Sequence, residues 1–184
     1  AVLLACYLLG TQDLHIIENR NKYTVNPDVT LGSSKWVDMH RYRSHTENTL
    51  ECVQRLKRDG YRIVVTTPHA ENVTPATIDL TGPMAFCFGT ELTGASDVLM
   101  AHADEHLRIP MHGFTESYNI SVSAAIVLYT VMERLRASEV DWRLSPTDLV
   151  TLKLQWARKV VHSAQHLEAR FRLDAGEGDA GRMS

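Results

Sequence analysis

The chain has 184 residues, 44% of them hydrophobic, so it can bury one substantial core, and a single globular domain is the first expectation. Its formal net charge of −3 lacks the basic excess of many nucleic-acid-binding proteins, so any contact with RNA must come from local patches. The three cysteines, Cys6, Cys52 and Cys87, lie far apart without a C-x-x-C spacing. This pattern is typical of reduced thiols in the cytoplasm and argues against a disulfide framework or a zinc site.

The first ten residues, AVLLACYLLG, form an apolar run. A helix that spans a bilayer needs about 20 apolar residues, and no basic region precedes the run as it would in a signal peptide. We therefore expect the run to be part of a helix. Because neither a capping residue nor an initiator methionine stands ahead of it, we also expect that N-terminal sequence is missing.

Residues 13–18, DLHIIE, have strand character and are followed by a polar, turn-forming stretch. Ser44, with Glu47 three residues later, matches a capping box and predicts the start of a helix. Apolar residues at helical spacing continue this helix until Gly60 ends it.

Two short apolar runs come next in the chain. Residues 62–67 predict a buried strand, and residues 84–89 predict another. Ser96 is suited to cap a short helix that continues through Ala103, and residues 107–109 predict a brief strand. Alternation of short apolar strands with amphipathic helices favours an α/β fold with a mainly parallel sheet.

The C-terminal part of the chain is expected to be helical. Residues 120–135 are apolar around most of a helix, and Ser145, followed by proline, predicts the start of a last helix. We expect one α/β domain over residues 1–140, a helical extension over 141–173, and a disordered Gly- and Asp-rich tail over 174–184.

Three segments place small or polar residues directly after a buried apolar run: 64–69, 88–96 and 109–125. Because ligands of open α/β sheets gather at the carboxyl ends of strands, we expect these segments to line one pocket. The second segment contains a G-x-x-x-x-G pattern, but Ala95 stands where a phosphate-binding loop needs lysine. A nucleoside triphosphate site is therefore disfavoured.

Two of these segments resemble known motifs. FGTELTGAS resembles the second motif, and IPMHGFTESYNISVSAAIVLY the third, of the SpoU/TrmH family of SPOUT methyltransferases. The resemblance covers residues 1–136, and GSSKWVDMHRY resembles the segment after the first strand of tRNA-modifying members. It implies methylation of an RNA ribose 2′-oxygen with S-adenosylmethionine as cofactor, with a guanosine in tRNA as the target.

The same resemblance implies a fold and a site. The sheet would carry helices on both faces, and the C-terminal segment would be threaded into a deep trefoil knot that forms the cofactor pocket of a homodimer. The residues implied to contact S-adenosylmethionine are Thr67, Gly89, Ile109, Met111 and Tyr118. The candidates for activating the ribose hydroxyl are Glu91, Ser117 and Asn119. Ser117 and Asn119 are also suited to capping the helix that follows them.

The chain departs from the family's first motif, N-x-x-A-x-x-R, whose arginine is implicated in activating the hydroxyl. Ala1 takes the alanine position and Leu4 takes that of the arginine. Leu4 therefore leaves a second hypothesis open, a module that binds the cofactor and RNA with little catalysis. A small-molecule methyltransferase has no support in the sequence.

The expected partner is RNA, with tRNA favoured over rRNA. Arg41 and Arg43 form a basic cluster that would contact RNA phosphates. Two histidine pairs at i and i+4, beginning at His102 and His162, lack a third ligand at suitable spacing. We therefore expect no metal site, and no membrane partner.

Overall fold

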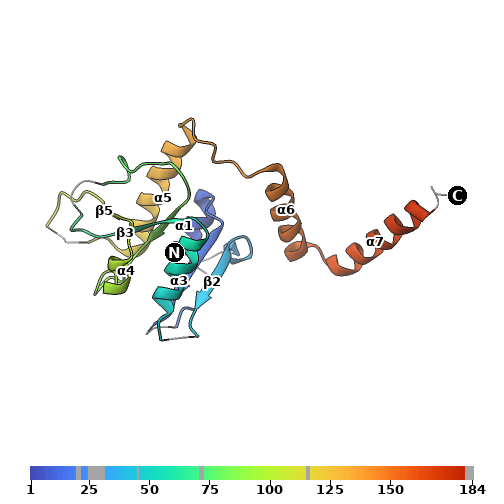
Figure 1. Ribbon diagram of the computed structural model, residues 1–184, viewed down its shortest axis with the longest axis horizontal. Coiled ribbons are helices and arrows are strands. Elements are labelled where there is room, and N and C mark those ends of the chain that lie inside the picture. The colour runs from blue at the N-terminus through green and yellow to red at the C-terminus, as the bar shows by residue number, and fades with distance from the viewer. Residues whose placement is uncertain (20–21, 25–31, 45, 71–72, 115–116, 181–184) are drawn as a thin grey trace. The chain divides into compact units, whose positions relative to one another are not determined.

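The computed structural model describes residues 1–19, 22–24, 32–44, 46–70, 73–114 and 117–180 (Figure 1). The chain divides into two compact units, Ala1–Trp142 and Arg143–Ser184. The first unit holds all the strands found in the described ranges. The division lies close to the expected boundary after residue 140, and the assignment of domains to these units stays a prediction.

The larger of two parallel sheets has the strand order β4-β3-β5. Its strands are β3 (Arg62–Thr66), β4 (Met84–Cys87) and β5 (Glu105–Leu107), and β3 pairs with both neighbours in parallel. The central strand carries the run of β-branched residues at 63–65, each fully buried. A continuous apolar run of this kind suits a parallel strand that is covered on both faces.

A second, two-stranded parallel sheet joins β1 (Asp13–Ile17) to β2 (Asp38–Tyr42). The sequence did not predict β2, which follows a short 3₁₀ helix, Ser33–Lys35, and is mostly polar. Contacts across the strands stabilise it, because the His15 and His40 rings stack with centroids 4.5 Å apart. Burial of His15, together with repulsion from His40, lowers its pKa to about 4.

One face of the larger sheet is covered by α3 (Asn48–Arg58) and α4 (Asp97–Ala101), which pack on Ile63 and Val65. The predicted Ser96 cap of α4 is confirmed, since its hydroxyl accepts a hydrogen bond from the Leu99 N–H.

The predicted capping box of α3 is wrong. Glu47 occupies the N-cap position and makes no side-chain capping bond, so the helix begins after the box rather than at Ser44. Packing of the apolar face, with Cys52 and Val53 buried, fixes this helix more than its first residue does.

The opposite face is covered by α5 (Ile120–Arg136), whose Val127 and Val131 pack against Val64. The N-terminal helix α1 (Val2–Leu9) packs on α5 rather than on the sheet. The predicted α/β fold with parallel strands is therefore confirmed, and the residues alternating along β3 meet helices on both sides.

The second unit contains two helices where the sequence predicted one, α6 (Pro146–Val160) and α7 (Ala164–Ala180). The predicted cap at Ser145 is present, because its side-chain hydroxyl accepts a hydrogen bond from the Asp148 N–H. The helix breaks because Ser163 adopts a left-handed conformation with φ of 59°. The backbone of α7 is helical to Ala180, past the point where the tail was expected to lose structure.

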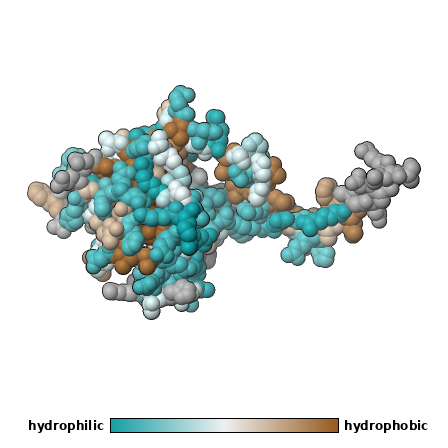
Figure 2. Space-filling model, in the orientation of Figure 1, coloured by the Kyte–Doolittle hydropathy of each residue, from teal (hydrophilic) through white to brown (hydrophobic). Residues whose placement is uncertain are grey.

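Hydrophobic side chains remain on the surface of α6 (Figure 2). No residue of this helix is buried, and its large hydrophobic side chains that are exposed by 40% or more are Leu149, Val150, Leu154 and Val160. None of the helices within the described ranges has the length and apolarity needed to cross a bilayer.

All three cysteines are free thiols. Burial raises the pKa of Cys52 to about 11 and that of Cys87 to about 12, and it also raises the pKa of Cys6. Thiols held in the protonated form by burial are poor nucleophiles and poor metal ligands.

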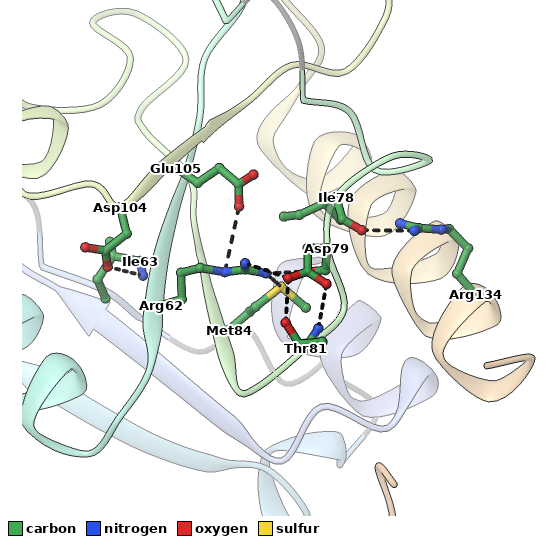
Figure 3. A network of polar contacts seen from close by, with 9 residues as sticks. All are labelled: Arg62, Ile63, Ile78, Asp79, Thr81, Met84, Asp104, Glu105 and Arg134. Atoms are coloured by element: carbon green, nitrogen blue, oxygen red, sulfur yellow. Dashed lines mark hydrogen bonds and ion pairs between the residues drawn. The ribbon is translucent and has the colours of Figure 1, made fainter. Parts of the chain in front are cut away.

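An ion-pair network closes the amino ends of the β4-β3-β5 strands (Figure 3). The Arg62 guanidinium lies between two carboxylates, 3.6 Å from that of Asp79 and 3.7 Å from that of Glu105. Asp104 accepts a 2.8 Å hydrogen bond from the Ile63 N–H. The polar groups at this edge are therefore paired with one another.

Candidate active site

A cavity of about 380 Å³ lies at the carboxyl ends of the same three strands. Its wall comes from residues 66–69 after β3, residues 88–95 after β4, residues between 107 and 123 around and after β5, and Met100 of α4. The prediction that three segments line one pocket is confirmed. The volume falls in the range of about 300–1,000 Å³ that is typical of small-molecule and cofactor sites.

The structure brings nearly all the candidate site residues to this wall. Seven of the eight predicted cofactor-binding and catalytic residues line the cavity: Thr67, Gly89, Glu91, Ile109, Met111, Ser117 and Tyr118. Asn119 is outside the lining but bonds directly to one of its members. Their roles stay predictions, whereas their common location is a feature of the fold.

The loop after β4 closes back on its own first glycine. Thr90 and Gly94 exchange two backbone hydrogen bonds of 2.9 Å, which fold the loop tightly. A Cβ atom on Gly89 would lie 2.0 Å from the Gly94 carbonyl carbon and 2.1 Å from the Ala95 nitrogen. Only glycine fits there, because a side chain at position 89 would collide with the backbone of the same loop.

Asn119 connects this loop to the start of α5. Its amide nitrogen donates a 2.5 Å hydrogen bond to Glu91 Oε1. Its Oδ1 accepts from the Ser121 N–H at 2.9 Å and so caps α5. The Ile120 N–H also points at Glu91 Oε1, at 3.4 Å. The capping role considered for Asn119 is therefore present, and the same side chain bonds to Glu91 of the pocket wall; its role in organising the pocket stays a prediction.

The pocket wall combines apolar surface with hydroxyl groups. Phe88, Leu107 and Ile109 supply apolar area, while Thr67 and Thr93 supply hydroxyls. Among the described residues of the wall, none is lysine or arginine. A ligand with a flat apolar ring and polar edges fits this surface better than a polyphosphate does. S-adenosylmethionine, with an adenine, a ribose and an amino-acid end, is such a ligand.

The wall residue Met100 was not predicted from the sequence; it reaches the cavity from α4. It carries no motif signal, because its placement depends on how α4 packs on the sheet. Ser123, in the first turn of α5, lies within the predicted segment 109–125 but was not singled out as a site residue.

The remaining candidates lie away from the cavity wall. Leu4 is a half-buried residue of α1. Arg41 donates hydrogen bonds to Glu18 and to the Tyr23 carbonyl, and its hydrogen bond lowers the pKa of Glu18. Arg43 is exposed just after β2. In the described parts of the chain, no three His, Cys, Asp or Glu side chains group closely enough to hold a metal ion.

Residues 1–129, which include the whole pocket wall, match the model of the SpoU rRNA Methylase family. The chain belongs to this family. It is 44% identical over 161 residues to the tRNA (guanosine(18)-2′-O)-methyltransferase of Borreliella burgdorferi, covering 88% of this chain and 72% of that protein.

Solved structures agree with membership in the SpoU family. The TrmH/SpoU tRNA modifying enzyme of A. aeolicus superposes with a TM-score of 0.72 at 28% identity, covering 88% of this chain and 82% of that one. The SpoU methyltransferase AviRb from Streptomyces viridochromogenes, solved with the cofactor AdoMet, shares the fold with a TM-score of 0.64 at 22% identity. The alignment covers 74% of this chain and 55% of that one.

Proposed function

We propose that this SpoU-family chain transfers a methyl group from S-adenosylmethionine to the ribose 2′-oxygen of a guanosine in tRNA. The observation that carries this proposal is the pocket in which the loop closed on Gly89 meets the Asn119-capped end of α5. The names of the relatives support tRNA as the substrate, and rRNA is the second choice.

The pocket wall fits the cofactor by shape and by chemistry. We assign its adenine and ribose to the surface formed by Thr67, Gly89, Ile109, Met111 and Tyr118. The missing Cβ of Gly89 lets the loop at 88–95 fold tightly against its own backbone, which sets the shape of this part of the wall. When bound, the cofactor supplies a methyl group that is activated by its positive sulfur.

The chain's own residues orient the ribose hydroxyl and accept its proton. Asn119 and the Ile120 N–H hold Glu91 through Oε1, and Oε2 makes no hydrogen bond with the described residues. Oε2 is therefore able to accept a proton from the 2′-hydroxyl as the new O–C bond forms and the C–S bond breaks. Ser117, on the same wall, supplies a hydroxyl that orients the ribose.

Leu4 supports a second candidate function, a module that binds cofactor and RNA with little turnover. The described wall contains no arginine to take the place of the one absent from α1. If the arginine position matters here, Leu4→Arg raises the rate of methyl transfer. Binding of cofactor and tRNA without transfer, even by Leu4→Arg, would favour the module.

Arg43 is our first candidate for contact with RNA phosphates outside the pocket. It is exposed after β2, whereas Arg41 already bonds to Glu18 and must change partners to bind RNA. Neutralising Arg43 should weaken tRNA binding at low salt more than at high salt.

We also propose a homodimer in which apolar side chains of α1 and α5 meet a second copy. Tyr7, Leu8, Val122 and Tyr129 are between 43% and 69% exposed on these two helices, which pack on each other. An exposed apolar cluster of this kind is typical of an interface. Light scattering that gives a dimer for the natural chain and a monomer for Leu8→Asp would support this arrangement.

The trefoil knot and the cytoplasmic location are part of the same proposal. Support for the knot is that four residues after β5 share a cavity with the loop at 88–95: Ile109, Met111, Ser117 and Tyr118. Support for the location is the set of free, buried thiols. An experimental trace of the chain from β5 to α5 would test the threading directly.

The deciding experiment measures transfer of radiolabelled methyl from S-adenosylmethionine to unmodified tRNA and rRNA transcripts. We expect label in tRNA, recovered as 2′-O-methylguanosine after nuclease digestion, and much less with Glu91→Gln. Ser145→Ala, which loses a cap outside the pocket, is the control. Failure to bind S-adenosylmethionine in calorimetry would overturn the proposal. Label in rRNA alone would show that tRNA is the wrong substrate.

A further inference from the structure

A second cavity, of about 560 Å³, adjoins the first. It shares Pro68, His69 and Met111 with the pocket wall, and its other lining residues are Arg108, Pro110, His112 and Gly113. Because the two cavities have walls in common, a ligand that fills the first can continue into the second.

The lining of the second cavity is rich in hydrogen-bond donors. Arg108, His69 and His112 are all exposed, and the described lining contains no carboxylate. Within the described residues none of these three side chains forms an ion pair. A planar guanidinium beside two imidazoles, with no acid to neutralise it, suits an anion with several oxygens.

Backbone hydrogen bonds fix the positions from which two of these side chains extend. Arg108 lies between the buried residues Leu107 and Ile109, and its N–H donates a 2.8 Å hydrogen bond to the Val73 carbonyl. The His69 N–H donates to Thr67 Oγ1 at 3.3 Å, next to the pocket. Main chain that is already fixed at the end of a strand does not have to be ordered when a ligand binds, so only the side chains lose freedom.

An aromatic side chain follows the lining directly in the sequence. Phe114, next to Gly113, is fully exposed, with its whole ring in solvent. A water-exposed ring is a suitable platform for a nucleobase, since every base has a π-face to stack on it.

We propose that the second cavity binds the nucleotide next to the one that is methylated. Arg108, with the imidazoles of His69 and His112, binds the phosphate that links the two nucleotides, and Phe114 stacks on the neighbouring base. This inference rests on the proposed function, because it requires a ribose of RNA in the first pocket. The shared wall at Pro68, His69 and Met111 then places the linking phosphate at the second cavity.

The first experiment measures the affinity of the 184-residue chain for tRNA over a series of salt concentrations. Arg108→Ala should weaken binding roughly 10-fold at low salt and reduce the salt slope by about one phosphate contact. Arg58→Ala removes the same charge from the exposed end of α3, beside the amino end of β3, and should change neither quantity. Affinity for S-adenosylmethionine should stay the same in both variants.

The second experiment compares substitutions of the aromatic ring. Phe114→Ala should raise the KM for tRNA roughly 5- to 150-fold, and Phe114→Trp should restore it because the indole also stacks. Phe114→Leu keeps apolar bulk without a π-face, so it should behave like the alanine variant.

The outcomes separate this subsite from the proposed function. If the natural chain neither binds nor methylates tRNA, the proposed function falls. If it methylates tRNA and Arg108→Ala matches Arg58→Ala, the subsite is wrong and the function stands. If Arg108→Ala weakens binding of S-adenosylmethionine instead, the second cavity belongs to the cofactor, and the subsite is wrong for that reason.

Discussion

At the amino edge of the β4-β3-β5 sheet, Arg62 lies between the carboxylates of Asp79 and Glu105, whereas at the carboxyl edge Arg108 pairs with no described carboxylate. The same three strands therefore end in two different ways. Charged groups at the amino edge form ion pairs with one another and contribute to stability. Those at the carboxyl edge leave donors and acceptors open, which is the arrangement that a ligand needs.

Two glycines, one at each end of β4, differ in the same way as the two edges of the sheet. Gly82, just before β4, has a φ of +73° and open space around its missing Cβ, while Gly89, just after β4, has backbone atoms in that place. An alanine at Gly82 is opposed by its own backbone conformation. An alanine at Gly89 is opposed by the loop that forms the pocket.

The largest effect is expected from Gly89→Ala. Since the new Cβ would sit 2.0 Å from the Gly94 carbonyl carbon, the loop must open. We expect the Kd for S-adenosylmethionine, measured by calorimetry, to rise roughly 100-fold or more, and methyl transfer to fall with it.

Gly82→Ala is the matched control for this change. It should lower the free energy of unfolding by about 1 kcal/mol and leave the cofactor Kd unchanged. Equal effects of both alanines on cofactor binding would remove the distinction between the two edges.

The next effect tests the double role of Asn119. Asn119→Ser keeps a capping oxygen for α5 but loses the amide donor to Glu91, so stability should hold while kcat falls roughly 10- to 100-fold. Ser145→Ala removes a comparable cap from α6 and should lower stability without lowering kcat. A normal kcat in Asn119→Ser would show that its bond to Glu91 has no part in transfer.

Local sequence patterns were enough to predict the elements on which the site is built. The β-branched run at 62–67 predicted β3, and the apolar residues at 120–135 predicted α5, because burial on both sides determines those residues directly. Strand β2 was missed since its polar residues are held by contacts with β1 that are distant in sequence. The break at Ser163 was missed because a left-handed φ on serine has no pattern in sequence.

For the site, the sequence predicted which residues take part but not how they contact one another. Motif resemblance pointed to Gly89, Glu91 and Asn119, and the fold brings all three together. It did not predict that Asn119 bonds to Glu91, because that bond joins two loops whose approach is set by packing. Arg108, in the lining of the second cavity, gave no signal in the sequence, since a single arginine beside a strand is most often a surface residue.

The amino edge should respond to Arg62→Met with a loss of stability alone. Glu105 Oε2 is buried without a hydrogen bond and depends on the guanidinium, whose side chain is 27% exposed. We expect the free energy of unfolding in urea to fall by about 2 kcal/mol. Cofactor affinity should be unchanged, so a large change in the Kd for S-adenosylmethionine would contradict the division between the edges.

The smallest effect is expected from Asp104 and depends on pH. Burial raises the pKa of this carboxyl, but hydrogen bonds from Lys57 and from the Ile63 N–H outweigh it and leave the pKa below the usual 3.8. A carboxyl with a lowered pKa in the folded state stabilises the protein above pH 3.8, and this contribution is lost as the pH falls through the folded-state pKa.

Unfolding in urea at pH 5 and pH 3 checks this sign. At pH 5 the free energy of unfolding of the natural chain should exceed that of Asp104→Asn by no more than about 1 kcal/mol, because the carboxylate is partly exposed to solvent. This difference between the two chains should be smaller at pH 3. In a chain that carries Lys57→Met, the same difference in unfolding free energy should also be smaller, since the Lys57 ammonium donates one of the two hydrogen bonds that lower the pKa of Asp104. A gap that stays constant with pH would mean that Asp104 acts through its shape rather than its charge, and would separate it from the ion pairs at the amino edge.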